Sequence, residues 1–109
     1  MEQIQLKDKE VFKQEGRGMV NLIDEPFLLM NQVCLEPGQD VPVHQANSHV
    51  TLQLISGRAT ILVTAEKVTT GPGNLLRIPL GSSMSIRNES PERLVFLVMK
   101  TPRPDMLKG

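Results

Sequence analysis

The sequence predicts a single all-β domain, either a sandwich or a closed barrel. The 109-residue chain has room for one domain of ordinary size. Short runs rich in Val, Ile and Leu recur along it and are separated by Gly, Pro, Asn or Asp, as in strands joined by tight turns. No segment carries a sustained helical period of apolar residues with a cap at each end, so no long helix is expected.

The expected strands follow these runs in chain order. They are 18–23, 27–35, 49–55, 58–64, 74–78, 84–87 and 93–99. Turn-forming residues lie between or before them, at 15–18, 24–26, 36–38, 56–57, 71–73 and 79–81. The core barrel therefore spans about 18–101, with two further strands expected in the N-terminal segment 1–17, at 3–6 and 11–13. The tail 102–109 is expected to pack on the surface or fray, because Pro102 and Pro104 cannot continue a central strand.

Two of the expected strands contain runs that are apolar on both faces. These runs, 94–99 and 27–30, do not alternate as a strand with one wet face should. The outer face of at least one sheet is therefore expected to be covered. A homodimer interface is the simplest cover and would also protect sheet edges, whereas a helix or the chain termini are the alternative.

Composition limits the function classes. Twelve Lys and Arg balance twelve Asp and Glu, and three Phe without Tyr or Trp offer no aromatic platform, so we expect no nucleic-acid partner and no stacking of sugars or bases. The single Cys allows no intrachain disulfide, which favours a reducing cytoplasm. Segment 1–10 lacks the apolar core of a signal peptide, and the longest apolar run is too short to span a membrane. We therefore expect a cytoplasmic protein without a membrane partner.

Two segments have the spacing of a known pair of motifs. In the first, Gly38 is followed after five residues by His44, and Gly57 closes the segment. The second segment places five residues between Gly73 and Pro79 and continues in register through three further positions, which are Gly81, Met84 and Asn88. Together these segments resemble the two motifs of the cupins, of the small single-domain, RmlC-like type, and the likeness covers nearly the whole chain. The resemblance implies a double-stranded β-helix, that is, a jelly-roll barrel of six to eight strands.

The same resemblance implies where a metal would bind. In metal-binding cupins two His and a Glu of the first motif, with a His of the second, hold one metal ion inside the barrel. The first His is kept as His44, whereas the other three positions carry Ala46, Val50 and Met84. Ala and Val offer no donor atom, and a thioether is a soft ligand that favours copper. We therefore expect no cofactor.

The alternative, a bound metal ion, depends on the direction of the His49 side chain. His49 lies next to Val50, so strand parity points it away from the barrel, although a one-residue bulge would turn it inward. His44 and an inward His49, with Met84 or Cys34, would then hold a divalent transition metal or copper. Otherwise His49 is a surface residue, and Cys34 is a buried, inert thiol that faces the pocket or an interface.

The function we predict is small-molecule binding, in a sensing or accessory role, by an apolar pocket around His44 and Met84. Ala46, Val50 and Leu52 would line that pocket if the strand over 49–55 alternates as expected. His44 would orient the ligand or act as an acid or base. One alternative is a metal-dependent enzyme of isomerase, decarboxylase or dioxygenase type that uses His44 and His49. Another is a purely structural dimer with a filled barrel. The sequence does not decide whether the protein is an enzyme.

Overall fold

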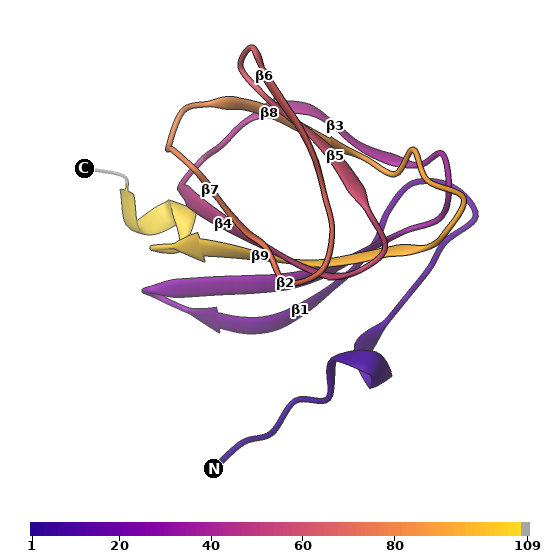
Figure 1. The fold of residues 1–109 in the computed structure, drawn as a ribbon. Helices are drawn as coiled ribbons and strands as arrows, with labels where there is room; N and C mark the ends of the chain where they lie inside the picture. The colour runs from indigo at the N-terminus through magenta and orange to yellow at the C-terminus, as the bar shows by residue number, and fades with distance from the viewer. Residues whose placement is uncertain (108–109) are drawn as a thin grey trace.

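Two antiparallel sheets face one another in the computed structural model, which describes residues 1–107 (Figure 1). One sheet has five strands in the order β1-β2-β9-β4-β7, and the other has four in the order β3-β8-β5-β6. The strands are β1 (Gly18–Glu25), β2 (Leu28–Leu35), β3 (Asp40–Gln45), β4 (His49–Ser56), β5 (Ala59–Val63), β6 (Glu66–Thr70), β7 (Leu75–Ile78), β8 (Ser83–Arg87) and β9 (Leu94–Thr101). Two short 3-10 helices, η1 (Leu6–Lys9) and η2 (Pro104–Leu107), flank them.

The core lies between the inner faces of the two sheets. Strand β9 crosses the middle of the larger sheet, bonded to β2 on one side and β4 on the other, and Phe96 at its centre is fully buried. Ile61 and Ile86 of the smaller sheet belong to the same apolar cluster. This arrangement confirms the predicted all-β jelly-roll barrel.

Nine strands form within residues 1–107, more than the expected six to eight, because two were not predicted. Strand β3 contains Pro42 and polar residues, and a bulge interrupts its pairing with β8, so it lacks a simple alternation. Strand β6 is an edge strand without a single buried side chain, so it carries no apolar pattern. Both form because a neighbouring strand pairs with them, not because of their own apolar residues.

The N-terminal segment 1–17 does not form the two strands expected at 3–6 and 11–13. It contains η1 instead and runs along the outer face of the larger sheet (Figure 1). The buried Gln32 holds it there, donating from Nε2 to the carbonyl of Leu6 at 2.9 Å. Further along, the ring of Phe12 packs 4.2 Å from the guanidinium of Arg93.

This covering segment accounts for part of the doubly apolar strand 94–99. Val95 and Leu97 point to the outer face of the larger sheet and are nevertheless buried. Of the covers expected for that face, the chain terminus is therefore present, and the homodimer stays a prediction. No helix in the described part of the chain is long and apolar enough to cross a membrane.

The C-terminal tail begins as expected after β9. The carbonyl of Pro102 accepts a hydrogen bond from Ser48 Oγ at 2.5 Å, and η2 follows on the surface. Lys108 and Gly109, the end of the predicted 102–109 tail, lie outside the described residues.

The last residue of the second motif fastens a loop. Asn88 is 1% exposed and donates from Nδ2 to the carbonyls of Leu35 and Glu92, at 3.1 and 2.7 Å. Its Oδ1 accepts from the hydroxyl of Ser90 at 2.9 Å. The side chain therefore ties the β8–β9 loop to the end of β2, which explains why an amide suits this position.

Gly57, between β4 and β5, should be the least replaceable turn residue. Its φ is +81°, and an added Cβ would lie 2.2 Å from the carbonyl oxygen of Arg93, a backbone atom. We expect Gly57→Ala to lower the free energy of unfolding by about 3 kcal/mol or more, measured by urea denaturation. Gly38→Ala is the matched control, because its φ is +86° but nothing lies within 4 Å of the added Cβ. That variant should lose only about 1 kcal/mol, and equal losses in the two variants would contradict the role of the close contact.

Candidate functional site

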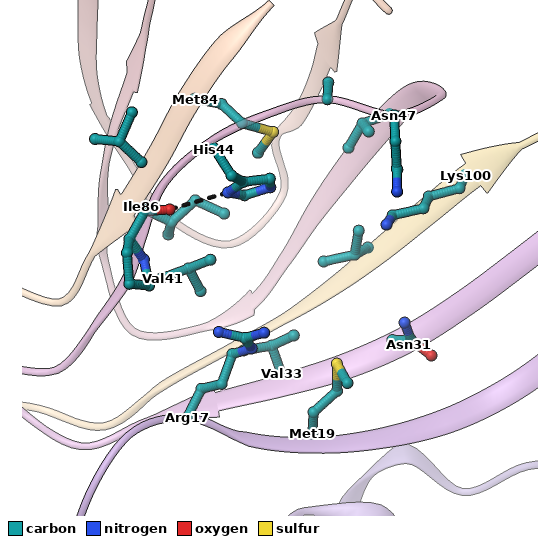
Figure 2. A pocket seen from close by; sticks show the side chains of 15 residues that line it. Arg17, Met19, Asn31, Val33, Val41, His44, Asn47, Met84, Ile86 and Lys100 are labelled. Atoms are coloured by element: carbon teal, nitrogen blue, oxygen red, sulfur yellow. Dashed lines mark hydrogen bonds between the residues drawn. The ribbon is translucent and has the colours of Figure 1, made fainter. Parts of the chain in front are cut away.

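A cavity of about 310 Å³ opens between the two sheets at one end of the barrel (Figure 2). Its wall is mainly apolar and buried, and its rim is polar. The wall residues are Val33, Val41, Ala46, Val50, Met84, Ile86 and the half-buried Val98. The polar rim residues are Arg17, Asn31, His44, Asn47 and Lys100. The volume falls at the lower end of the range for small-molecule pockets.

A β-bulge directs His44 into this cavity. Val41 pairs with Ile86 and His44 pairs with Met84, so a step of three residues on β3 matches a step of two on β8. The extra residue reverses the parity of the strand, so that both His44 and Val41 face inward. The sequence allows a bulge between His44 and His49, whereas the structure places it before His44.

The imidazole of His44 is oriented by the backbone. Its Nδ1 lies 2.9 Å from the carbonyl oxygen of Pro42, which can only accept, so Nδ1 carries the proton. In the neutral ring Nε2 is therefore the free acceptor. Figure 2 shows the ring beside Met84 at the cavity mouth, so this nitrogen is available to a ligand or to a proton transfer.

The cavity brings together four of the residues that the sequence singled out. His44, Ala46, Val50 and Met84 all line it. Two backbone bonds hold the loop at Ala46 in place, from its N–H to the carbonyl of Ser82 and from the N–H of Gly81 to its own carbonyl, each 2.8 Å long. The loop before β8 therefore fixes the position of the loop before β4, which contributes Ala46 and Asn47 to the cavity.

Three other sequence candidates lie elsewhere. Leu52 is buried in the core deeper along β4 and does not line the cavity. His49 is exposed and outside the cavity, since strand parity turns it away when Val50 points in. Cys34 is buried on the opposite face of β2 from Val33, and burial raises the pKa of its thiol. The set of His44, His49 and Cys34 is therefore not assembled.

The side chains present do not fit the four-ligand metal centre of the motif. Of its four positions, only His44 keeps a nitrogen donor, and Met84 supplies a thioether. In residues 1–107 no three His, Cys, Asp or Glu side chains gather closely enough to hold a metal ion.

Sequence reasoning missed the two cations of the rim. Lys100 directly follows the apolar run 94–99 and continues the inward alternation of Phe96 and Val98, so the period of two could have found it. Arg17 lies just before β1, on the same face as Met19. No alternating pattern in the sequence indicated that Arg17 would face the cavity. The pocket is therefore apolar in its wall, as predicted, but cationic at its rim.

Lys100 is half-buried in this rim, and its backbone pairs with the apolar Leu29 on β2 and Val50 on β4. Desolvation lowers the pKa of the amine, and the nearby charge of Arg17 lowers it further. None of the described residues that line the cavity carries a carboxylate to offset either effect.

Comparison with known proteins places the chain in a family. No protein-family model matches it. It is 31% identical over 101 residues to the uncharacterized protein MJ0764 of Methanocaldococcus jannaschii, covering 90% of this chain and 87% of that protein. The crystal structure of MJ0764, an RmlC-like cupin family protein with a double-stranded β-helix fold, superposes with a TM-score of 0.78 over 91% of this chain and 94% of that one, at 28% identity. The chain belongs to the RmlC-like cupin family.

Two further structures share the architecture. TT1209 of Thermus thermophilus superposes with a TM-score of 0.88 and is 27% identical, covering 95% of this chain and 100% of that one. A predicted oxalate decarboxylase of Thermotoga maritima superposes with a TM-score of 0.72 at 20% identity, covering 80% of this chain and 81% of that one. The second likeness concerns the fold alone.

Removing the charge of Lys100 should stabilise the protein. The pKa of the Lys100 amine is lower in the folded protein than in the unfolded chain, so the unfolded chain binds the proton more tightly. The charged amine therefore destabilises the folded state, and this destabilisation is greatest at a pH where the amine is charged in both states. We expect Lys100→Met to raise Tm by a few degrees at pH 7. The gain should shrink as pH rises through the folded pKa toward the unfolded one.

Calorimetric melting of both proteins from pH 7 to 10 measures this difference. Lys9→Met is the control, because Lys9 is exposed on η1 and does not line the cavity, and its Tm difference should stay near zero. A lower Tm for Lys100→Met at pH 7 would show that its amine stabilises the fold instead.

Proposed function

We propose that the cavity binds a small organic molecule directly, without the metal that other cupins use, and that the protein acts as a binding, sensing or accessory domain. The observation that carries the proposal is the replacement of three of the motif's four ligands by Ala46, Val50 and Met84, all of which line a cavity of about 310 Å³. The substituted side chains therefore leave space in the barrel where ligands to a metal would stand.

The chemistry of the lining supports a ligand with an apolar body. Val50 on β4, and Met84 and Ile86 on β8 of the facing sheet, are each at most 3% exposed and line the cavity. Burying hydrocarbon against these side chains contributes about 25 cal/mol per Å² of apolar area. Met84 adds an adaptable surface that fits irregular shapes. His44 and the other rim groups would then set the orientation of the ligand.

The loss of three metal-ligating side chains also predicts how much metal the purified protein carries. Protein purified without a tag from cells supplied with Fe, Mn, Ni, Zn and Cu should carry substoichiometric metal after dialysis, as measured by elemental analysis. The triple variant Ala46→His, Val50→Glu, Met84→His restores the four ligands of the motif and should retain about one equivalent. Stoichiometric metal in the wild type that disappears in His44→Ala would overturn the metal-free proposal.

Filling the cavity should abolish binding. Ala46 is 3% exposed with its side chain toward the cavity, so Ala46→Leu places three additional carbon atoms inside it. We expect small organic molecules to shift the amide resonances of cavity residues in the wild type and to leave them unchanged in Ala46→Leu. Gln45→Leu is the control, since Gln45 is exposed and does not line the cavity, and its spectra should respond as the wild type does. Equal responses in Ala46→Leu would place the binding site elsewhere.

A further inference from the structure

The position of Lys100 has no structural explanation in the fold. Lysines on edge strands protect them from pairing, but β9 is bonded on both sides, to β2 and to β4. Its inward face carries Phe96 and Val98 before Lys100, so an apolar residue would continue the core at that position. An inward charge between Leu29 and Val50 instead lowers the stability of the barrel.

Within residues 1–107 the two rim cations have no carboxylate partner, unlike three of the cations on the surface. On the surface, Arg93 pairs with Glu36 at 2.8 Å, and Arg103 pairs with Asp24 at 3.2 Å. Within residues 1–107 neither Arg17 nor Lys100 forms an ion pair, and neither side chain donates a hydrogen bond; Figure 2 shows both reaching into the cavity. Two positive charges therefore face the same cavity, and no carboxylate within residues 1–107 pairs with either of them.

A third group adds a donor to this side of the cavity. The Oδ1 of Asn31 accepts a hydrogen bond from Nδ2 of Asn21 at 2.9 Å, so the amino end of the Asn31 amide is the end left for the cavity. Arg17, Lys100 and Asn31 together offer many N–H groups, and no Asp or Glu lines the cavity to accept from them. The natural complement is an anion with several acceptor atoms.

We propose that the cavity binds a small carboxylate whose charged end lies between Arg17 and Lys100 and whose hydrocarbon part lies among the buried side chains of Val50, Met84 and Ile86. This inference rests on the proposed function and names the ligand class of the same cavity. A guanidinium matches a carboxylate in a bidentate fork, and the ammonium adds a point charge. The bound anion would also relieve the repulsion between the two cations.

A carboxylate fits better than a phosphate monoester. Protein phosphate sites commonly use backbone N–H groups at the start of a helix or in a glycine-rich loop. The two helices of the described chain are single 3-10 turns, and neither contributes a residue to the cavity. The donors here are instead side chains on strands and beside them.

Hexanoate and hexanamide are matched probes for this proposal, because they share a hydrocarbon tail and differ in charge. In titrations followed by calorimetry and amide chemical shifts, we expect hexanoate to bind in the cavity at least about tenfold more tightly than hexanamide. The affinity for hexanoate should fall with ionic strength, whereas that for hexanamide should not.

Charge-removing variants then test the two residues. Arg17→Gln and Lys100→Gln should each weaken hexanoate binding by about tenfold or more and leave hexanamide binding unchanged. Arg58→Gln and Lys9→Gln, which remove exposed cations outside the cavity, should bind hexanoate as the wild type does. Arg17 is exposed, so its variant remains informative should Lys100→Gln fold poorly.

The outcomes separate this inference from the proposed function. If hexanamide binds in the cavity as tightly as hexanoate, the anion inference fails and small-molecule binding stands. If hexyl phosphate binds more tightly than hexanoate, the carboxylate assignment fails. If neither hexanoate nor hexanamide perturbs cavity residues, the inference is overturned, and the Ala46→Leu comparison decides the proposed function by itself.

Discussion

The pairing register of β9 is the constraint on which the rest of the structure depends. This strand is bonded along most of its length to both β2 and β4, so the directions of the side chains on the three strands are fixed together. Because side chains alternate with a period of two, placing Phe96 in the core also points Lys100 inward. The same register turns Cys34 and His49 outward. A slip by one residue would exchange the two faces and empty the core.

The cavity combines groups that lower stability with groups that raise it. Its wall consists of side chains packed as in any core, and the surrounding barrel is stabilised by their burial. Its rim holds two cations whose mutual repulsion opposes folding. Exposed ion pairs such as Arg93–Glu36 contribute little to stability, because water screens the two charges. Charge retained in a cavity at the expense of stability is typical of sites that recognise a ligand.

Much of the fold and part of the site could be predicted from local pattern. The apolar runs located most strands to within a few residues, and the motif spacing placed His44, Ala46, Val50 and Met84 around one cavity. Strands β3 and β6 could not be predicted in this way. The bulge in β3 and the lack of any buried side chain in β6 remove the alternation that identifies a strand. The short apolar runs of the N-terminal segment suggest strands, but the segment forms none. A strand also needs a neighbouring strand to pair with, and a local pattern carries no information about that neighbour.

The sequence by itself determined that the chain folds as a β-barrel of the cupin type and that three positions of the metal motif carry no nitrogen or carboxylate donor. These properties depend on residue type and spacing, which are local. Only the tertiary structure decided that His44 faces inward, because a bulge before it reverses the strand parity. Only the tertiary structure brought Arg17 and Lys100 to one rim, since they lie at opposite ends of the chain and meet through the pairing of β1 with β2 and of β2 with β9. Proximity between distant residues is created by strand pairing, and no local pattern carries it.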